Sequence, residues 1–118
     1  MEQRFSQSGQ RALVWAYQAA KRLGHGAIGP EHLLLGALHE EDGRLARLAE
    51  EQLERGNAVG DGPSALTVQG AGVIERAAVL AAPHGIITSR WLLTALLQDS
   101  QGPGEALLHR CGQEGELL

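Results

Sequence analysis

Apolar residues recur every three to four positions through much of this chain, which is the spacing of one face of an α-helix. The first run predicts a helix from about Ser6 to Leu23. Ser6 or Ser8 supplies the hydroxyl expected of an N-cap, and Gly24 is placed to end the helix in the left-handed conformation. The pattern therefore favours a helix close to the start of the chain.

Two more helices are expected before the middle of the chain. Pro30 suits a first helical position, because its missing N–H would be unpaired there, and Gly43 is expected to break this second helix. A third helix is expected over about 44–55. The second helix carries a wide apolar stripe, which predicts burial: Leu33, Leu34, Leu35 and Leu38.

A glycine-rich linker is expected over 56–66, and after it the second half is expected to contain the same order of helices as the first. Thr67 is the expected N-cap of a helix over 68–82, and Thr88 is the expected N-cap of the next one. Beyond these the sequence predicts a last short helix over 104–111 and a frayed tail over 112–118.

An internal repeat is the most informative feature of the sequence. The segment 25–38, HGAIGPEHLLLGAL, matches the segment 84–97, HGIITSRWLLTALL, at a constant offset. We expect one repeat over about 4–55 and a second over about 67–111. Packed face to face, they predict an all-α, pseudo-symmetric bundle that makes residues 1–118 a single domain.

Composition and charge narrow the classes of protein that fit. Leu and Ala carry most of the apolar content and aromatic residues make up only 3%, which favours helices over sheets. Lys and Arg number 10 against 14 Asp and Glu, giving a net charge of −4 without a basic block, so we expect no nucleic-acid partner. The sequence shows no secretory leader, no apolar run of roughly 20 residues and only one cysteine, Cys111. We expect a cytoplasmic protein without membrane contact.

Motifs for catalysis are missing from the sequence. It contains no phosphate-cradling G-x-x-x-x-G-K-[ST] loop, no G-x-S-x-G nucleophile turn and no H-E-x-x-H zinc motif. His32 and His39 are seven residues apart and can share a helix face, but no cysteine lies near them to complete a zinc site. We therefore expect no enzyme activity, no cofactor and no metal, and structural roles for His25 and His84 in the connectors.

Three segments of the first half resemble the Clp N-terminal repeat, the family of domains carried by Clp-C and Clp-A type AAA+ unfoldases. They are Arg4-Phe5-Ser6, the run AKRLGH over 20–25 and the run IGPEHLLLG over 28–36. The second repeat is recognisable but degenerate, so the resemblance covers about 4–111. It implies a two-repeat helical domain that docks adaptors or substrates. Because the sequence lacks the ATPase modules, we expect either a stand-alone homologue or an excised domain, and the degenerate second repeat favours the former.

The resemblance also implies a ligand. Clp-C type domains are similar to receptors for phosphorylated arginine, in which a first-turn glutamate of each repeat grips the guanidinium. Glu31 keeps that position in repeat one, whereas Arg90 replaces the glutamate in repeat two and Trp91 replaces the histidine. Because an arginine repels a guanidinium, phosphoarginine is expected at one site only, and Arg90 is a candidate for attracting an acidic partner instead.

Helix starts offer unpaired N–H groups that receive phosphate or carboxylate groups, so we expect partner or phosphoarginine binding there. The candidates are Ser6, Glu31, Thr67 and Arg90. Exposed aromatic residues are enriched where partners bind, and two aromatic residues only two positions apart on a helix cannot share one face. The aromatic candidates for partner contact are Phe5, Trp15, Tyr17 and Trp91.

Hypotheses from different functional classes compete. The sequence favours a non-catalytic protein-binding module of the Clp protease and chaperone system, which docks a Clp unfoldase, an adaptor or a marked substrate, or acts as a decoy for them. A helical DNA-binding regulator is the alternative, because short helices split by glycine turns imitate a helix-turn-helix, although the acidic balance opposes it. A hydrolase would need an acid, a base and a nucleophile brought together, which the sequence does not offer.

Overall fold

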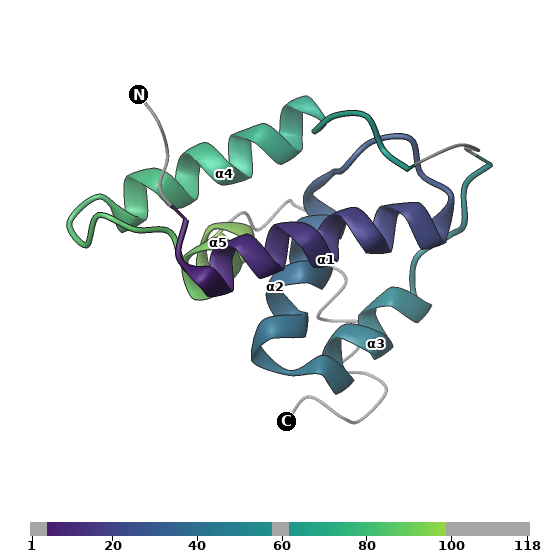
Figure 1. Ribbon diagram of the computed structural model, residues 1–118, viewed down its shortest axis with the longest axis horizontal. Helices are drawn as coiled ribbons and strands as arrows, with labels where there is room; N and C mark the ends of the chain where they lie inside the picture. The colour runs from purple at the N-terminus through teal and green to yellow at the C-terminus, as the bar shows by residue number, and fades with distance from the viewer. Residues whose placement is uncertain (1–4, 58–61, 99–118) are drawn as a thin grey trace.

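The computed structural model describes residues 5–57 and 62–98, which contain five α-helices around a common core (Figure 1). The helices are α1 (Gln7–Leu23), α2 (Pro30–Glu41), α3 (Gly43–Glu51), α4 (Val68–Ala81) and α5 (Ser89–Gln98). None of these five helices is long and apolar enough to cross a membrane. The all-α prediction is confirmed, while the expected helix over 104–111, the tail over 112–118 and Cys111 lie outside the described residues.

Local caps set the starts of the two long helices. Ser6 Oγ accepts the Gly9 N–H at 3.0 Å at the start of α1, and Thr67 Oγ1 accepts the Gly70 N–H at 2.9 Å at the start of α4. Gly24 ends α1 with a φ of 73°, in the left-handed region that a glycine enters without strain. The caps predicted at Ser6 and Thr67 are therefore confirmed.

The junction of α2 and α3 differs from the prediction. Gly43 is expected to break a helix, yet it is the first residue of α3. The break is made by Asp42, whose Oδ1 accepts the N–H groups of Arg44 and Leu45 at 3.1 and 3.3 Å. A carboxylate satisfies the unpaired donors of a new helix start, so the backbone leaves the helical conformation at Asp42 and not at the glycine.

The end of α3 also differs, because the helix stops at Glu51 and does not reach residue 55. The chain beyond it bonds to the end of α1 instead of continuing the helical ladder. The Arg55 guanidinium donates to the Arg22 carbonyl at 2.8 Å, and the Gly56 N–H donates to the Leu23 carbonyl at 2.7 Å. Tertiary hydrogen bonds thus override the local helical preference of this segment.

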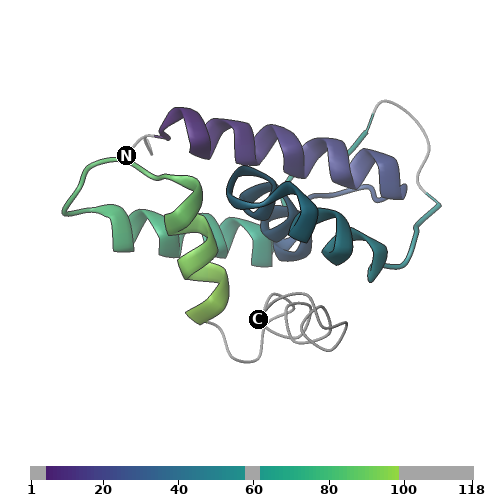
Figure 2. The ribbon, with the colours of Figure 1, turned by 90° about the horizontal axis from the view of Figure 1, so that it is seen from below.

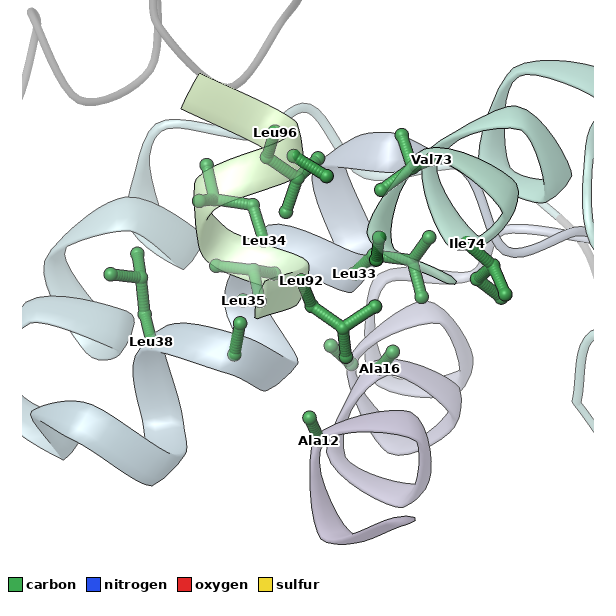
Figure 3. Close-up of a cluster of buried hydrophobic side chains, with 14 of the residues drawn as sticks. Ala12, Ala16, Leu33, Leu34, Leu35, Leu38, Val73, Ile74, Leu92 and Leu96 are labelled. Atoms are coloured by element: carbon green, nitrogen blue, oxygen red, sulfur yellow. The ribbon is translucent and has the colours of Figure 1, made fainter. Parts of the chain in front are cut away.

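α2 is the central helix and contacts each of the other four. Its stripe of Leu33, Leu34, Leu35 and Leu38 is at most 3% exposed, as the sequence predicts. Figure 3 shows these side chains gathered with residues of α1, α4 and α5 into one cluster. Each buried leucine contributes about 1.5–3 kcal/mol relative to an exposed one, so this stripe is a major source of stability.

The two halves of the chain hold each other through matching backbone contacts. The Ser6 N–H donates to the Ile87 carbonyl at 2.9 Å, and the Thr67 N–H donates to the Ile28 carbonyl at 2.9 Å. Isolated parallel β-bridges accompany these bonds: Phe5 with Ile87, and Ile28 with Leu66. Each connector thus pairs with the residues that precede the first helix of the other half, and α1 and α4 run in opposite directions (Figures 1 and 2).

Glycines allow these crossings to be close. Gly9 is the third residue of α1, and a methyl group on it would collide with the Ile87 carbonyl oxygen. Gly70 is the third residue of α4, where a methyl group would lie 2.7 Å from the Ile28 carbonyl oxygen. Equivalent glycines therefore serve the same packing need in both halves.

Substituting one crossing glycine is expected to destabilise the domain. Gly9→Ala should lower the free energy of unfolding by about 1–3 kcal/mol, because the added methyl group meets backbone that cannot rotate away. Gly72→Ala is the matched control, since its Cβ meets nothing within 4 Å, and it should raise stability by up to about 1 kcal/mol. Urea unfolding measures both, and equal effects of the two substitutions would contradict the close crossing.

Candidate functional site

An apolar groove lies between α1 and α4 and encloses about 430 Å³. We call it the apolar groove, and its lining is Phe5, Leu13, Ile28, Leu33, Leu66, Ala71, Ile74 and Glu75. Glu75 is the only charged residue in this set. Leu66 is 40% exposed, so part of the apolar wall is open to solvent. A hollow of this size and character is typical of ligand sites in proteins.

The two long helices begin beside this groove. Phe5 directly precedes the N-cap Ser6, and Leu66 directly precedes the N-cap Thr67. α1 and α4 run in opposite directions (Figure 1), so the lining residues that precede them, Phe5 and Leu66, lie toward opposite ends of the groove. Each cap satisfies one first-turn N–H, while other first-turn N–H groups have no acceptor within the helix. The groove therefore combines apolar walls with hydrogen-bond donors at its ends.

The start of α4 meets the start of α2, which brings two predicted site residues together. The Thr67 N–H bonds to the connector before α2, and the Cβ position of Gly70 lies 3.5 Å from the Gly29 Cα. The Glu31 carboxylate folds back against the same Gly29. The Glu31 carboxylate and the first turn of α4, which Thr67 caps, thus lie against the same glycine, Gly29.

The negatively charged Glu31 carboxylate forms no ion pair with any residue that the structure describes. Its Oε1 lies 3.3 Å from His32 Nδ1, but that nitrogen accepts the Gly29 N–H at 2.9 Å and so carries no proton. Burial, reinforced by the neighbouring His25, lowers the pKa of His32 to about 4. His32 is therefore neutral near pH 7 and does not neutralise Glu31.

The two histidines form a continuous hydrogen-bonded chain. Because His32 Nδ1 accepts from the backbone, His32 Nε2 carries the proton and donates to His25 Nδ1 at 2.6 Å. His25 Nε2 then donates to the Glu54 carbonyl at 2.8 Å. This chain ties the start of α2 to the segment after α3, which is the structural role expected of His25.

The start of α1 meets the start of α5 in the corresponding way. The Ser89 N–H donates to Ser8 Oγ at 3.2 Å, and Ser8 Oγ lies 3.0 Å from Ser6 Oγ. Glu41, at the end of α2, accepts from Ser89 Oγ at 3.0 Å and from Arg90 Nε at 2.8 Å. Arg90, a candidate for attracting an acidic partner, is already paired with an acid of its own chain, Glu41. The two predicted sites therefore differ, with an unpaired acid at one and an ion pair at the other.

Two of the predicted aromatic contacts are stacked on histidines. Trp15 lies on His39 with ring centroids 3.8 Å apart, and its indole N–H donates to Glu40 at 3.0 Å. Trp91 lies on His84 with centroids 5.3 Å apart. His39 is exposed and stacks on Trp15, whereas His32 is buried. Among the described residues no group of three or more His, Cys, Asp or Glu side chains is placed to hold a metal ion.

The other two aromatic candidates lie in different places. Phe5 lines the apolar groove, while Tyr17 is half-buried and lies against Gly62. The sequence reasoning did not identify Leu66 as a groove residue. The signal was available, because the alignment of Ser6 with Thr67 also aligns Phe5 with Leu66.

Comparison with known proteins gives consistent matches. Residues 4–59 match the family described as the Clp repeat (R) N-terminal domain. Over 92% of its length the chain is 27% identical to the chaperone protein ClpB of Oceanobacillus iheyensis, of which it spans 15%. Over 37% of its length it is 46% identical to the negative regulator of genetic competence ClpC/MecB of Bacillus subtilis, of which it spans 5%. The resemblance noted in the sequence is confirmed, over a small share of each relative's length.

The fold has a counterpart among solved structures. It is similar to the crystal structure of the N-terminal domain of the caseinolytic protease associated chaperone ClpD from Arabidopsis thaliana. The TM-score is 0.70, the sequence identity is 22%, and the match covers 92% of this chain and 85% of that one. At this identity the match concerns the fold alone.

Acid is expected to destabilise the domain through His32. The pKa of His32 is about 4 in the folded protein against 6.5 for an ordinary histidine, so the unfolded chain takes up the proton first as the pH falls. The contribution to stability is fully present above about pH 6.5 and is lost toward about pH 4, by up to roughly 3 kcal/mol.

Urea unfolding of the wild type and of His32→Gln at about pH 7 and about pH 4.5 isolates this contribution, because other titrating groups act in both proteins. The wild type should lose more stability than His32→Gln over this range. His84→Gln is the control and should keep the wild-type dependence. Parallel losses in the wild type and His32→Gln would show that His32 is not held neutral.

Proposed function

We propose that this chain, whose residues 4–59 match the Clp repeat (R) N-terminal domain family, is a non-catalytic protein-binding domain of the Clp protease and chaperone system. The observation that carries the proposal is the apolar groove between α1 and α4, which has a helix start toward each end. An apolar hollow with a few polar groups at defined places suits a segment of another protein that exposes apolar side chains. The partner is an adaptor, a substrate or a Clp unfoldase; as a variant of this proposal, the chain acts as a decoy that competes with a Clp unfoldase for adaptors or substrates.

The proposed binding mode follows from the lining of the groove. Apolar side chains of the partner displace water from Phe5, Leu13 and Leu66, which gains roughly 25 cal/mol for each Å² of apolar surface buried. Carboxylate or carbonyl oxygens of the partner accept first-turn N–H groups of α1 and α4. Binding of this kind requires shape and donors but no reacting group.

The finer proposal is that a phosphorylated arginine is recognised at the meeting point of α2 and α4. The Glu31 carboxylate pairs with the guanidinium, and the start of α4, capped by Thr67, receives the phosphate. Support comes from the neutral His32, which leaves Glu31 its full charge. At the other meeting point Arg90 is paired with Glu41, so no second guanidinium is accommodated there.

The DNA-binding alternative gains no support from the α1–α2 pair. A helix-turn-helix places its second helix in the major groove, which requires that helix to be exposed. α2 is instead buried over the run from His32 to Leu38.

The groove is tested by placing a charge on its open wall. Leu66→Glu should weaken binding of a permanently unfolded protein, such as reduced and carboxymethylated lactalbumin, by about tenfold or more, because a buried unpaired carboxylate is costly. Val79→Glu is the matched control, since Val79 is 73% exposed on α4 and does not line the groove. Calorimetric titration measures both, and equal affinities of the two variants would remove the groove as the docking site.

The phosphoarginine proposal is tested by titrating free phosphoarginine. The wild type should bind at one site, and Glu31→Gln should lose about tenfold or more in affinity, because the charge-assisted bond to the guanidinium is lost. Glu51→Gln, an exposed acid on α3, is the control for net charge. Arg90→Glu should add a second site or strengthen binding. Undetectable binding by both the wild type and Glu31→Gln would remove this ligand while leaving the groove proposal intact.

A further inference from the structure

A second cleft lies between α1 and α3. Both of these helices pack on α2 (Figure 1). The cleft encloses about 510 Å³ and shares no lining residue with the apolar groove. Its floor is formed by buried small and apolar residues, and its rim carries three arginines: Arg22, Arg47 and Arg55. We call it the basic cleft. Its Arg22 end and its Trp15 end are separated by two turns of α1.

The charges at the Arg22 end do not cancel. Arg22 forms a two-pronged ion pair with Glu50, at 2.6 and 3.2 Å, which neutralises both groups. Arg55 donates to the Arg22 carbonyl at 2.8 Å, and a neutral carbonyl leaves its charge in place. Arg47 makes no hydrogen bond or ion pair with any residue that the structure describes, and Glu51 is the one further acid in the lining. Three arginines against two glutamates leave the cleft positive in a chain whose net charge is −4.

The other end of the cleft offers a fixed aromatic surface. Trp15 and His39 both line the cleft and stack on each other at 3.8 Å. The indole N–H of Trp15 is held by Glu40, which fixes the orientation of the ring. Tryptophan and arginine are, with tyrosine, the residue types most enriched among those that dominate protein–protein binding. The cleft therefore presents an aromatic contact at one end and unpaired positive charge at the other.

We propose that the basic cleft is a second docking surface, which binds an acidic segment of a partner protein that also carries an apolar side chain. The carboxylates of the segment pair with Arg47 and Arg55 and compete with Glu50 for Arg22. The apolar side chain lies on Trp15. Because the two hollows share no residue, this surface is independent of the apolar groove, and either proposal stands without the other.

The probe is a short fluorescein-labelled peptide rich in glutamate with one phenylalanine, and its lysine counterpart is the negative control. Fluorescence anisotropy at about 50 mM salt should detect binding of the glutamate peptide only, and added salt should weaken it. Arg47→Glu should lower the affinity by about tenfold, whereas Arg76→Glu on α4, with the same change in net charge, should stay within about twofold. In a Trp91→Phe background, the fluorescence of Trp15 should shift on binding.

Four results would overturn the inference. The first is that the glutamate peptide does not bind, and the second is that Arg47→Glu and Arg76→Glu lower its affinity equally. The third is that a single-stranded oligonucleotide binds more tightly than the peptide. The fourth is that Leu66→Glu no longer binds the peptide. The last result would place the peptide in the apolar groove, so the inference would fail while the proposed function stood. Retained peptide binding in Leu66→Glu, together with loss of unfolded-protein binding, would separate the two surfaces.

Discussion

The structure depends on a reciprocal backbone contact, in which each half of the chain supplies the acceptor for the helix start of the other. The Ser6 N–H reaches the Ile87 carbonyl, and the Thr67 N–H reaches the Ile28 carbonyl. Each bond contributes only about 0.5–1.5 kcal/mol net, but together they fix where α1 and α4 begin relative to the opposite connector. Glycine at the third position of both helices lets the backbones approach closely enough for this contact.

The same contact creates the features on which recognition is proposed to depend. It sets α1 and α4 antiparallel, which leaves the apolar groove between them, and it brings each of these helix starts to the start of a helix from the other repeat. The start of α4 consequently lies against Gly29, which the Glu31 carboxylate also contacts, and Ser6 lies in one hydrogen-bonded network with Ser89 and Arg90. Both meeting points are formed by residues far apart in the sequence, so neither repeat builds one by itself.

The two halves share one backbone arrangement but differ chemically, because their side chains differ. At the α2–α4 meeting point a neutral histidine leaves the Glu31 carboxylate charged and unpaired, whereas at the α1–α5 meeting point Glu41 and Arg90 neutralise each other. Repeat one also has the basic cleft, because the chain after α3 turns back onto the end of α1. The backbone bonds between the two halves do not depend on which side chains lie beside them, so the side chains at the two meeting points are free to differ.

The sequence by itself determined the features that depend on neighbouring residues. The caps at Ser6 and Thr67, the end of α1 at Gly24, the buried leucine stripe of α2 and the matched His-Gly-x-Ile connectors all follow from local hydrogen bonding and helical periodicity.

The tertiary structure alone decided the features that depend on distant partners. The early end of α3, the pairing of Arg90 with Glu41 and the two hollows each require contacts between separate helices. The helix break at Asp42 instead of Gly43 is a choice between two competing local caps, which helical periodicity does not make. Local patterns report how a segment prefers to fold, but they do not report which segment lies against it.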